Sequence, residues 1–151
     1  MDARWTLALV FLAACGTPAT NTGASVEQDG SYTQVVASDR DRVFHASIAA
    51  AKELGYTVEV ADPMAGRMSG RSEIKRRGLG AQVQYYVIRS DVEARQPGTD
   101  GVRLRVSITF THHLSGEPRT SMNDKIVGAR AKYDAFFEAV ARHIGNGAAS
   151  N

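Results

Sequence analysis

The residues from Val102 to Thr111 form the most regular stretch of the chain and constrain its fold most strongly. Every second position holds a hydrophobic side chain: Val102, Leu104, Val106, Ile108 and Phe110. The positions between them are polar and include Arg103 and Arg105. Successive side chains of a strand point to opposite faces, so the pattern predicts a strand with one covered and one polar face. Such a strand is typical of an antiparallel sheet covered on one side.

Weaker alternation elsewhere predicts the other strands of the same sheet. The expected strands cover residues 31–37, 56–61, 67–75 and 81–95, in addition to 102–111. Pro and Gly residues at 62–66 and 96–101 predict turns between them. In the long strand, Tyr85 and Val87 are expected on the same face as Arg103 and Arg105.

Apolar residues at helical spacing predict two helices, over about 39–54 and 122–144, with a loop at 112–121 before the second. Ser38 is the expected N-cap of the first helix, and Gly55 and Gly145 are expected to end the two helices. The predicted faces include Leu54 in the first helix and Ile126 in the second. The expected core comprises Leu104, Val106, Ile108, Phe44, Ile48, Phe137 and Val140.

The resulting order, β-α-β-β-β-β-α, keeps helices and strands apart along the chain. It predicts an α+β fold: a two-layer sandwich in which two helices cover one face of an antiparallel sheet. A helix ending in Leu54-Gly55-Tyr56, then a strand, Asp62-Pro63-x-x-Gly66, a further strand and a long final helix resemble BamC-like helix-grip domains of periplasmic lipoproteins. The resemblance covers about residues 31–145 and implies an accessory role in assembly of the outer membrane.

The N-terminus carries the pattern of an export signal. Residues 1–14 hold one cation, Arg4, and then an apolar segment too short to cross a bilayer. Leu12-Ala13-Ala14-Cys15 resembles the lipobox of bacterial lipoproteins. That resemblance implies cleavage before Cys15, acylation of its thiol, and anchoring in the cell envelope. Gly16 in place of an aspartate favours the outer membrane, facing the periplasm.

The rest of the chain divides into three parts. Residues 15–30 are rich in Thr, Ala and Gly and predict a flexible tether behind the lipidated Cys15. Residues 31–145 form a single expected domain, and 146–151 an expected disordered tail. Because Cys15 is the only cysteine, its lipidation excludes thiol catalysis, disulfides and cysteine metal sites together.

No motif predicts a catalytic residue, a metal site or a cofactor. His112 and His113 are adjacent on a strand and therefore point to opposite faces. His45 and His143 lack a metal-ligating partner one helical turn away, and no Gly-x-Ser-x-Gly motif is present. Asp91 and Glu93, flanked by Arg89 and Arg95, are interpreted as a solvated, neutralised edge.

Charge gives the main functional hypothesis. The formal net charge of +2 is too small for a nucleic-acid binder. Positive charge is concentrated between Gly66 and Gly80, where only Glu73 is acidic, and the uncovered sheet face adds two arginines. The candidate anion-binding or partner-binding residues are Arg67, Arg71, Lys75, Arg76, Arg77, Arg103 and Arg105. The alternative is a solvated hairpin tip without a partner.

Three functions remain open at this level. The leading hypothesis is a membrane-anchored, non-catalytic interaction domain that binds an envelope protein or an anionic lipid. The second is a carrier or sensor of a lipid or other apolar ligand, which requires a cavity between sheet and helices. The third is an envelope hydrolase that uses His112 or His113.

Overall fold

The computed structural model describes residues 24–27, 29–77, 82–94, 97–114, 125–126 and 130–148. In chain order the elements are β1 (Ser25–Val26), β2 (Tyr32–Val36), α1 (Arg40–Glu53), β3 (Tyr56–Asp62), β4 (Arg67–Ser72), β5 (Lys75–Arg77), β6 (Gln82–Val92), β7 (Val102–Leu114), β8 (Lys125–Ile126) and α2 (Arg130–Ala148). The predicted signal segment, residues 1–14, and the predicted lipidation site Cys15 lie outside the described residues.

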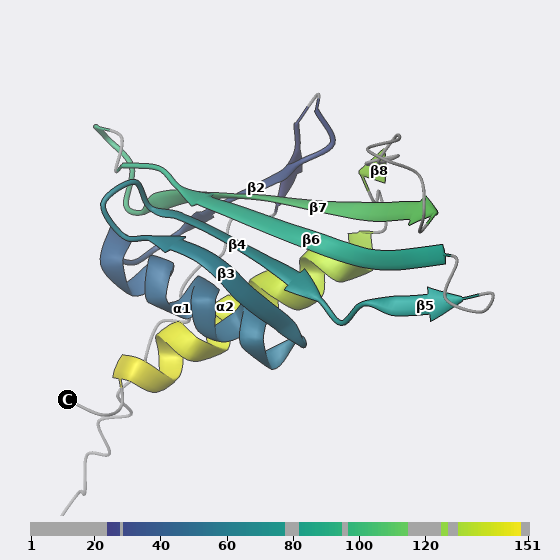
Figure 1. Cartoon of the computed structure of the whole chain (residues 1–151). Helices are drawn as coiled ribbons and strands as arrows, with labels where there is room; N and C mark the ends of the chain where they lie inside the picture. Colours follow the sequence, from purple (N-terminus) through teal and green to yellow (C-terminus); the bar gives the residue numbers. More distant parts are fainter. Residues whose placement is uncertain are drawn as a thin grey trace, which may run out of the picture.

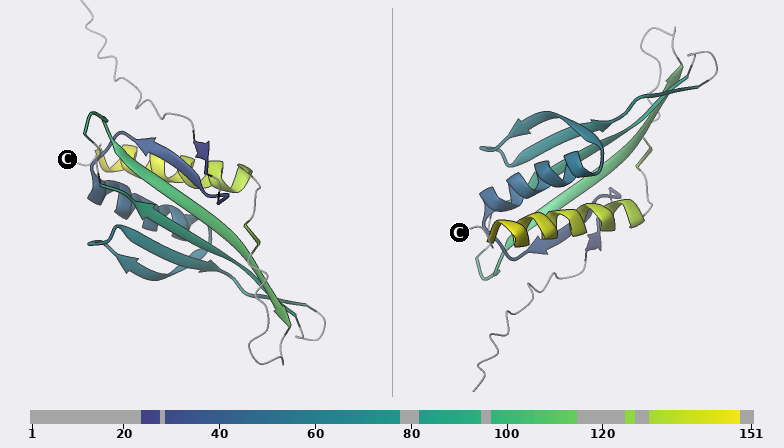
Figure 2. Two further views of the ribbon diagram at one scale, coloured as in Figure 1. Left: turned by 90° about the horizontal axis from the view of Figure 1, so that it is seen from above. Right: turned by 90° about the horizontal axis from the view of Figure 1, so that it is seen from below.

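The described strands form one antiparallel sheet of eight strands in the order β1-β2-β7-β6-β4-β3 (Figure 1). The short strands β5 and β8 are added to β6 and β7. Both helices lie on the same side of this sheet, roughly side by side, as the view from below in Figure 2 shows. The expected α+β class, with an antiparallel sheet and two helices on one face, is confirmed.

The core lies between the sheet and the two helices. Six of the expected core residues are buried there, and Ile48 is partly buried against them. Phe136, which the sequence interpretation left out, is fully buried beside Phe137. The largest fully buried side chains are Tyr133, Phe136, Met68, Ile88, Leu104 and Ile108. Burial of large apolar side chains of this kind supplies the main stabilisation of the fold.

The start and end of α1 differ slightly from expectation. Asp39, rather than Ser38, is the N-cap, because its Oδ1 accepts a hydrogen bond of 2.8 Å from the amide of Arg42. Gly55 reverses the chain after the helix with a φ of +82°, as predicted. Leu54 is the C-cap residue and is exposed, since the helical face has already ended at Glu53.

The second helix was misplaced by the sequence pattern. Residues 125–126 form β8, so Ile126 belongs to a strand that pairs with β7 at Thr109 and Phe110. The helix begins at Arg130 and continues through Gly145 to Ala148. A glycine inside a helix costs only about 1 kcal/mol, which tertiary packing can offset. The expected helix end at Gly145 is therefore wrong, as is the expected disorder at residues 146–148, while the rest of the expected tail lies outside the described residues.

Two strand boundaries were also misjudged. β7 runs on to Leu114, paired with Gln82 of β6, so residues 112–114 are strand and not loop. The expected strand 67–75 is interrupted after Ser72. There the hydroxyl of Ser72 accepts a hydrogen bond of 2.9 Å from the amide of Tyr86, and it takes the place of a backbone partner in the ladder between β4 and β6.

The domain also includes part of the expected tether. Ser25 and Val26 form β1 and pair with Thr33 and Tyr32 of β2. Asp29 bonds to a side chain of β7, Arg105. The boundary expected at residue 31 is thus too late, because the low hydrophobicity of this segment concealed its backbone pairing to β2.

A β-bulge in the edge strand β3 changes which side chains face outward. The register slips between Val58, which pairs with Gly70, and Val60, which pairs with Ser69. Val58 packs against the core, whereas Val60 is 57% exposed and lies on the opposite face. Strict alternation along residues 56–61 predicts that Val58 and Val60 share one face, and this prediction is wrong because the extra residue of a bulge breaks the alternation.

Candidate functional site

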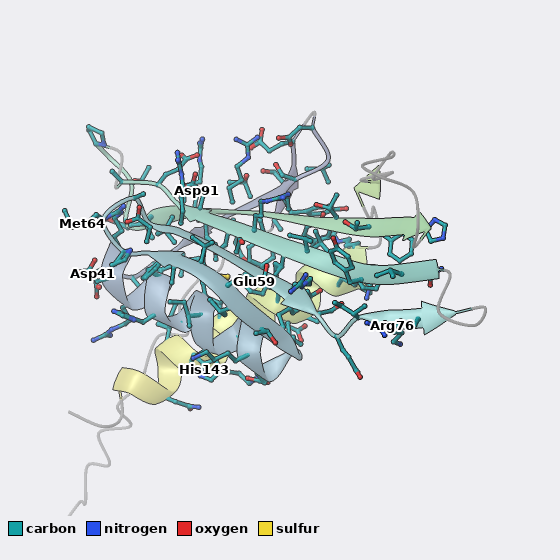
Figure 3. All side chains as sticks on the ribbon, in the orientation of Figure 1. Asp41, Glu59, Met64, Arg76, Asp91 and His143 are labelled. Atoms are coloured by element: carbon teal, nitrogen blue, oxygen red, sulfur yellow. The ribbon has the colours of Figure 1, made fainter. Side chains whose placement is uncertain are left out.

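The candidate site is the sheet face that no described helix covers. Alternation along β4, β6 and β7 places the odd-numbered side chains of these strands on it. Val87 pairs with Thr109, and Asp91 pairs with Arg105. The expectation that Tyr85 and Val87 share a face with Arg103 and Arg105 is therefore confirmed. In Figure 3, Asp91 lies on this side of the sheet and His143 lies on the helix side.

Four of the predicted cationic residues lie on this face, and each is paired with a carboxylate. The nitrogen–oxygen distances are 3.2 Å for Arg67–Asp91, 2.6 Å for Arg71–Glu59, 3.7 Å for Arg103–Glu93 and 2.6 Å for Arg105–Asp29. Exposed pairs such as these contribute little to stability, about 0–1 kcal/mol each. They place four guanidinium groups beside carboxylates on the face.

The remaining predicted cations lie elsewhere. Lys75, Arg76 and Arg77 form β5, which pairs with the N-terminal half of β6. Figure 3 shows Arg76 near the projecting end of the sheet, far from Asp91. The side chains of Lys75 and Arg76 are exposed. The single basic patch expected from the sequence is thus divided into a group of paired arginines and the separate strand β5.

Arg105 is held by a small network at one side of the face. Its Nη2 donates to Asp29 at 2.6 Å and its Nε donates to the hydroxyl of Ser31 at 3.0 Å. The Ser31 hydroxyl in turn donates to Asp29 at 2.6 Å. This hydrogen bond from Ser31, together with the nearby Arg105, holds the pKa of the Asp29 carboxyl below its ordinary value of 3.8.

Arg71 is held in a comparable way at the other side. Its guanidinium binds Glu59 and lies 5.4 Å from the centre of the Tyr85 ring. Guanidinium groups stack favourably on aromatic faces. Glu59 reaches this face by ordinary alternation after Val58, and the bulge then brings Val60 to the same side of β3.

Two depressions hollow the face. The larger has a volume of about 450 Å³ and lies between Val60 and Arg67 on one side and Asp29 and Arg105 on the other. The smaller, of about 200 Å³, is lined by residues that include Arg71 and Tyr85. Two residues, Ser69 and Arg89, line both depressions. We call the two depressions together the sheet groove.

Arg89 is the functional candidate that sequence reasoning missed. The sequence predicts that Arg89 belongs to a neutralised edge with Asp91 and Glu93. In the structure those carboxylates are paired with Arg67 and Arg103, and Arg89 has no carboxylate partner among the described residues. The sequence does indicate that Arg89 lies on this face. Arg89 is separated from Val87 and Tyr85 by two and four residues along the same strand, so all three side chains point to one side.

The other chemical candidates are dispersed. His112 lies in β7 opposite Gln84, and His45 is exposed on α1 with its ring against Phe44. His143, expected near a helix end, is more than a turn inside α2 and bonds to Glu53 at 2.9 Å. In the part of the chain that the structure describes, no three histidine, cysteine or acidic side chains gather as metal ligands, and no helix has the length and apolarity to cross a membrane.

No model of a known protein family matches this sequence, and no curated protein matches it. The protein is therefore classified here by its fold and its surface alone. The chain contains a two-layer α+β domain whose sheet presents a hollowed, polar, ion-paired face on the side opposite its helices.

Proposed function

We propose that this protein is a lipid-anchored, non-catalytic interaction protein of the bacterial cell envelope, which binds a partner protein through the sheet groove. The observation that carries the binding role is the groove itself. Its guanidinium groups are paired with Asp29, Glu59 and Asp91, so the groove presents several hydrogen-bond donors and acceptors on one face. Arginine is enriched in protein–protein interfaces, and three arginines line the larger hollow beside the exposed Val60.

The anchoring role rests on the sequence Leu12-Ala13-Ala14-Cys15 after a short apolar segment. A multiply acylated cysteine holds a protein stably on a membrane. The resemblance to BamC-like domains favours an accessory role in assembly at the outer membrane, facing the periplasm.

The anchor is tested by replacing Cys15 with alanine in the full chain. We expect the wild-type protein to lack residues 1–14, to carry acyl chains and to remain in the membrane fraction. The Cys15→Ala variant should remain an uncleaved precursor without acyl chains. Normal cleavage of the variant to a soluble periplasmic protein would show that the signal is an ordinary secretory one.

The binding surface is tested by photocrosslinking in living cells. A photoreactive amino acid is placed at Val60, which is 57% exposed in the groove, and in a second strain at Asp41, which is exposed on α1 on the other side of the sheet. We expect a discrete crosslinked protein from position 60 and none from position 41. Crosslinking from position 41 alone would assign the binding surface to the helices.

A further inference from the structure

Three side chains on adjacent strands form a continuous row across the middle of the sheet groove. Ser69 of β4 pairs with Arg89 of β6, and Arg89 pairs with Ser107 of β7. Directly opposed residues in an antiparallel sheet have Cβ atoms about 4.5–5.5 Å apart. The side chain of Arg89 therefore starts between those of two serines on one face. We call these three residues the central row.

The central row differs from the rows beside it in that its arginine is not paired with a carboxylate. Arg89 is exposed, and none of the three side chains has a hydrogen-bond or ion-pair partner among the described residues. The neighbouring carboxylates are already engaged, since Asp91 binds Arg67 and Glu59 binds Arg71. The positive charge of Arg89 is thus left available at the point where the two depressions meet.

We infer that the central row binds a carboxylate of an acidic segment in the partner protein. The inference rests on the proposed function and specifies the chemistry of the partner. A guanidinium presents a planar fork of N–H donors that fits the two oxygens of a carboxylate. The hydroxyls of Ser69 and Ser107 add donors on either side. Serine and arginine together thus offer donors for both oxygens without a further cation.

The charge pattern around the central row favours a single carboxylate over a membrane surface. The same face carries Asp29, Glu59, Asp91 and Glu93 within the ion pairs. A dense array of lipid phosphates would meet these four carboxylates as well as the arginines and would be repelled by them. A peptide can place one carboxylate on Arg89 and keep other groups away from the acidic side chains.

The wall of the larger depression specifies the neighbouring residue of the ligand. Val60 pairs with Ser69, so its side chain extends the central row by one strand and leaves apolar surface exposed beside the serine. A hydrophobic side chain next to the bound carboxylate would bury that surface. The central row thus fits a segment in which an acidic residue is flanked by aliphatic residues.

The test uses the full chain in mild detergent and two fluorescent, capped five-residue peptides. One has a central aspartate flanked by valines, and the other has asparagine in place of aspartate. Binding is followed by fluorescence anisotropy at low salt. We expect the aspartate peptide to bind at least about tenfold more tightly than the asparagine peptide, which corresponds to one charge-assisted hydrogen-bonded pair.

Variants distinguish the central row from general attraction. Arg89→Gln should weaken binding of the aspartate peptide by about tenfold or more, whereas Arg76→Gln, with the same loss of charge in β5, should change it by less than about twofold. Arg89→Lys should be intermediate, since it keeps the charge and loses the planar fork. Circular dichroism spectra identical to wild type confirm that each variant is folded.

Several results would overturn the inference. The inference is wrong if the aspartate peptide does not bind, or if the two peptides bind equally well. It is also wrong if Arg89→Gln and Arg76→Gln weaken binding of the aspartate peptide to the same extent. Arg89-dependent binding to phosphatidylglycerol vesicles, with no binding of the peptide, would assign the row to lipid headgroups instead. If the crosslink from position 60 persists undiminished in Arg89→Gln cells, the sheet groove remains the binding surface and the carboxylate site is wrong.

Discussion

The hydroxyl of Tyr133, on α2, lies 3.0 Å from the amide nitrogen of Ile108, on β7, and accepts its hydrogen bond. The same hydroxyl lies 3.5 Å from the carbonyl oxygen of Ile108. β2 pairs with β7 only as far as Val106, and β8 pairs with it from Thr109 onward. Tyr133 therefore satisfies the backbone of Ile108 at a gap in the sheet ladder, where a buried unpaired amide would be costly.

We predict that Tyr133→Phe lowers the free energy of unfolding by about 1–3 kcal/mol, because the buried amide of Ile108 loses its partner. The side chain is fully buried, so water cannot replace the hydroxyl without rearrangement. Urea denaturation of the purified chain measures the change. Burial also raises the pKa of the Tyr133 hydroxyl above its ordinary value of 10.0, so this group stays protonated near neutral pH.

Tyr32 provides the matched control, because its ring stacks on that of Tyr133 at a centroid distance of 4.1 Å. Its hydroxyl has no hydrogen-bond partner among the described residues. Tyr32→Phe should therefore change the unfolding free energy by less than about 0.5 kcal/mol. Equal losses in the two variants would mean that ring packing, and not the hydrogen bond to Ile108, makes Tyr133 important.

Local periodicity predicted the α+β fold well, and the reason is visible in β7. Its alternation from Val102 to Phe110 is uninterrupted, and its apolar side chains through Ile108 are all buried. The errors occur where tertiary contacts decide the structure. No local signal marks the short pairing that turns Lys125 and Ile126 into strand, or the bulge that exposes Val60.

The candidate site was predicted only in part for a similar reason. Sequence identifies which residues are charged and, through parity, which share a face. It does not reveal that the partner of Asp91 is Arg67 from another strand, which leaves Arg89 without one. The pairing depends on strand order and register, and these are properties of the whole sheet.

The turn between β3 and β4 supplies a second prediction. Gly66 has a φ of +73°, and a Cβ built there would lie 2.6 Å from the carbonyl oxygen of Val92 and 2.7 Å from Nη2 of Arg40. That arginine donates to the carbonyl oxygens of Val92, Pro63 and Met64, and so ties α1 to the turn. We predict that Gly66→Ala destabilises the domain by about 1–3 kcal/mol or more, from backbone strain and the displaced contacts.

Chemical denaturation measures this loss, and Gly98→Ala separates its two causes. Gly98 also has a positive φ, of +84°, but nothing lies within 4 Å of the position of its Cβ. The Gly98 variant should therefore lose only the strain of the left-handed conformation, about 1 kcal/mol. If Gly66→Ala costs no more than Gly98→Ala, the contacts of Arg40 with the turn are not important for stability.

Gly145 gives a prediction with the opposite sign. It lies inside α2, its φ is not positive, and nothing lies within 4 Å of the position of its Cβ. Alanine is the better helix former by about 0.8–1.0 kcal/mol in a helix interior. We predict that Gly145→Ala raises the free energy of unfolding by up to about 1 kcal/mol, measured by urea denaturation. A loss of stability would support a helix end at Gly145, where alanine would be strained.

The two helices are joined by an ion-paired cluster at the end of α1. Oε1 of Glu53 accepts a hydrogen bond of 2.6 Å from Arg142, and Oε2 lies 2.9 Å from Nε2 of His143. The hydrogen bond from Arg142 is the main cause that holds the pKa of the Glu53 carboxyl below its ordinary value of 4.5. A carboxyl with a lowered folded-state pKa favours the folded protein when it is ionised.

We therefore predict that Glu53→Gln is less stable than wild type near neutral pH, and that the difference disappears in acid. The contribution of Glu53 is fully present above its unfolded-state pKa, and is lost as the pH falls below 4.5 and through the lower folded-state value. Urea denaturation of both proteins at a series of pH values, from about pH 7 to about pH 3, measures this difference.

Glu138→Gln is the control, since Glu138 is exposed on α2 and has no ion-pair partner among the described residues. A difference between Glu53→Gln and wild type that stays constant over the whole series would show that the Glu53 carboxylate does not stabilise the helix pair through its charge.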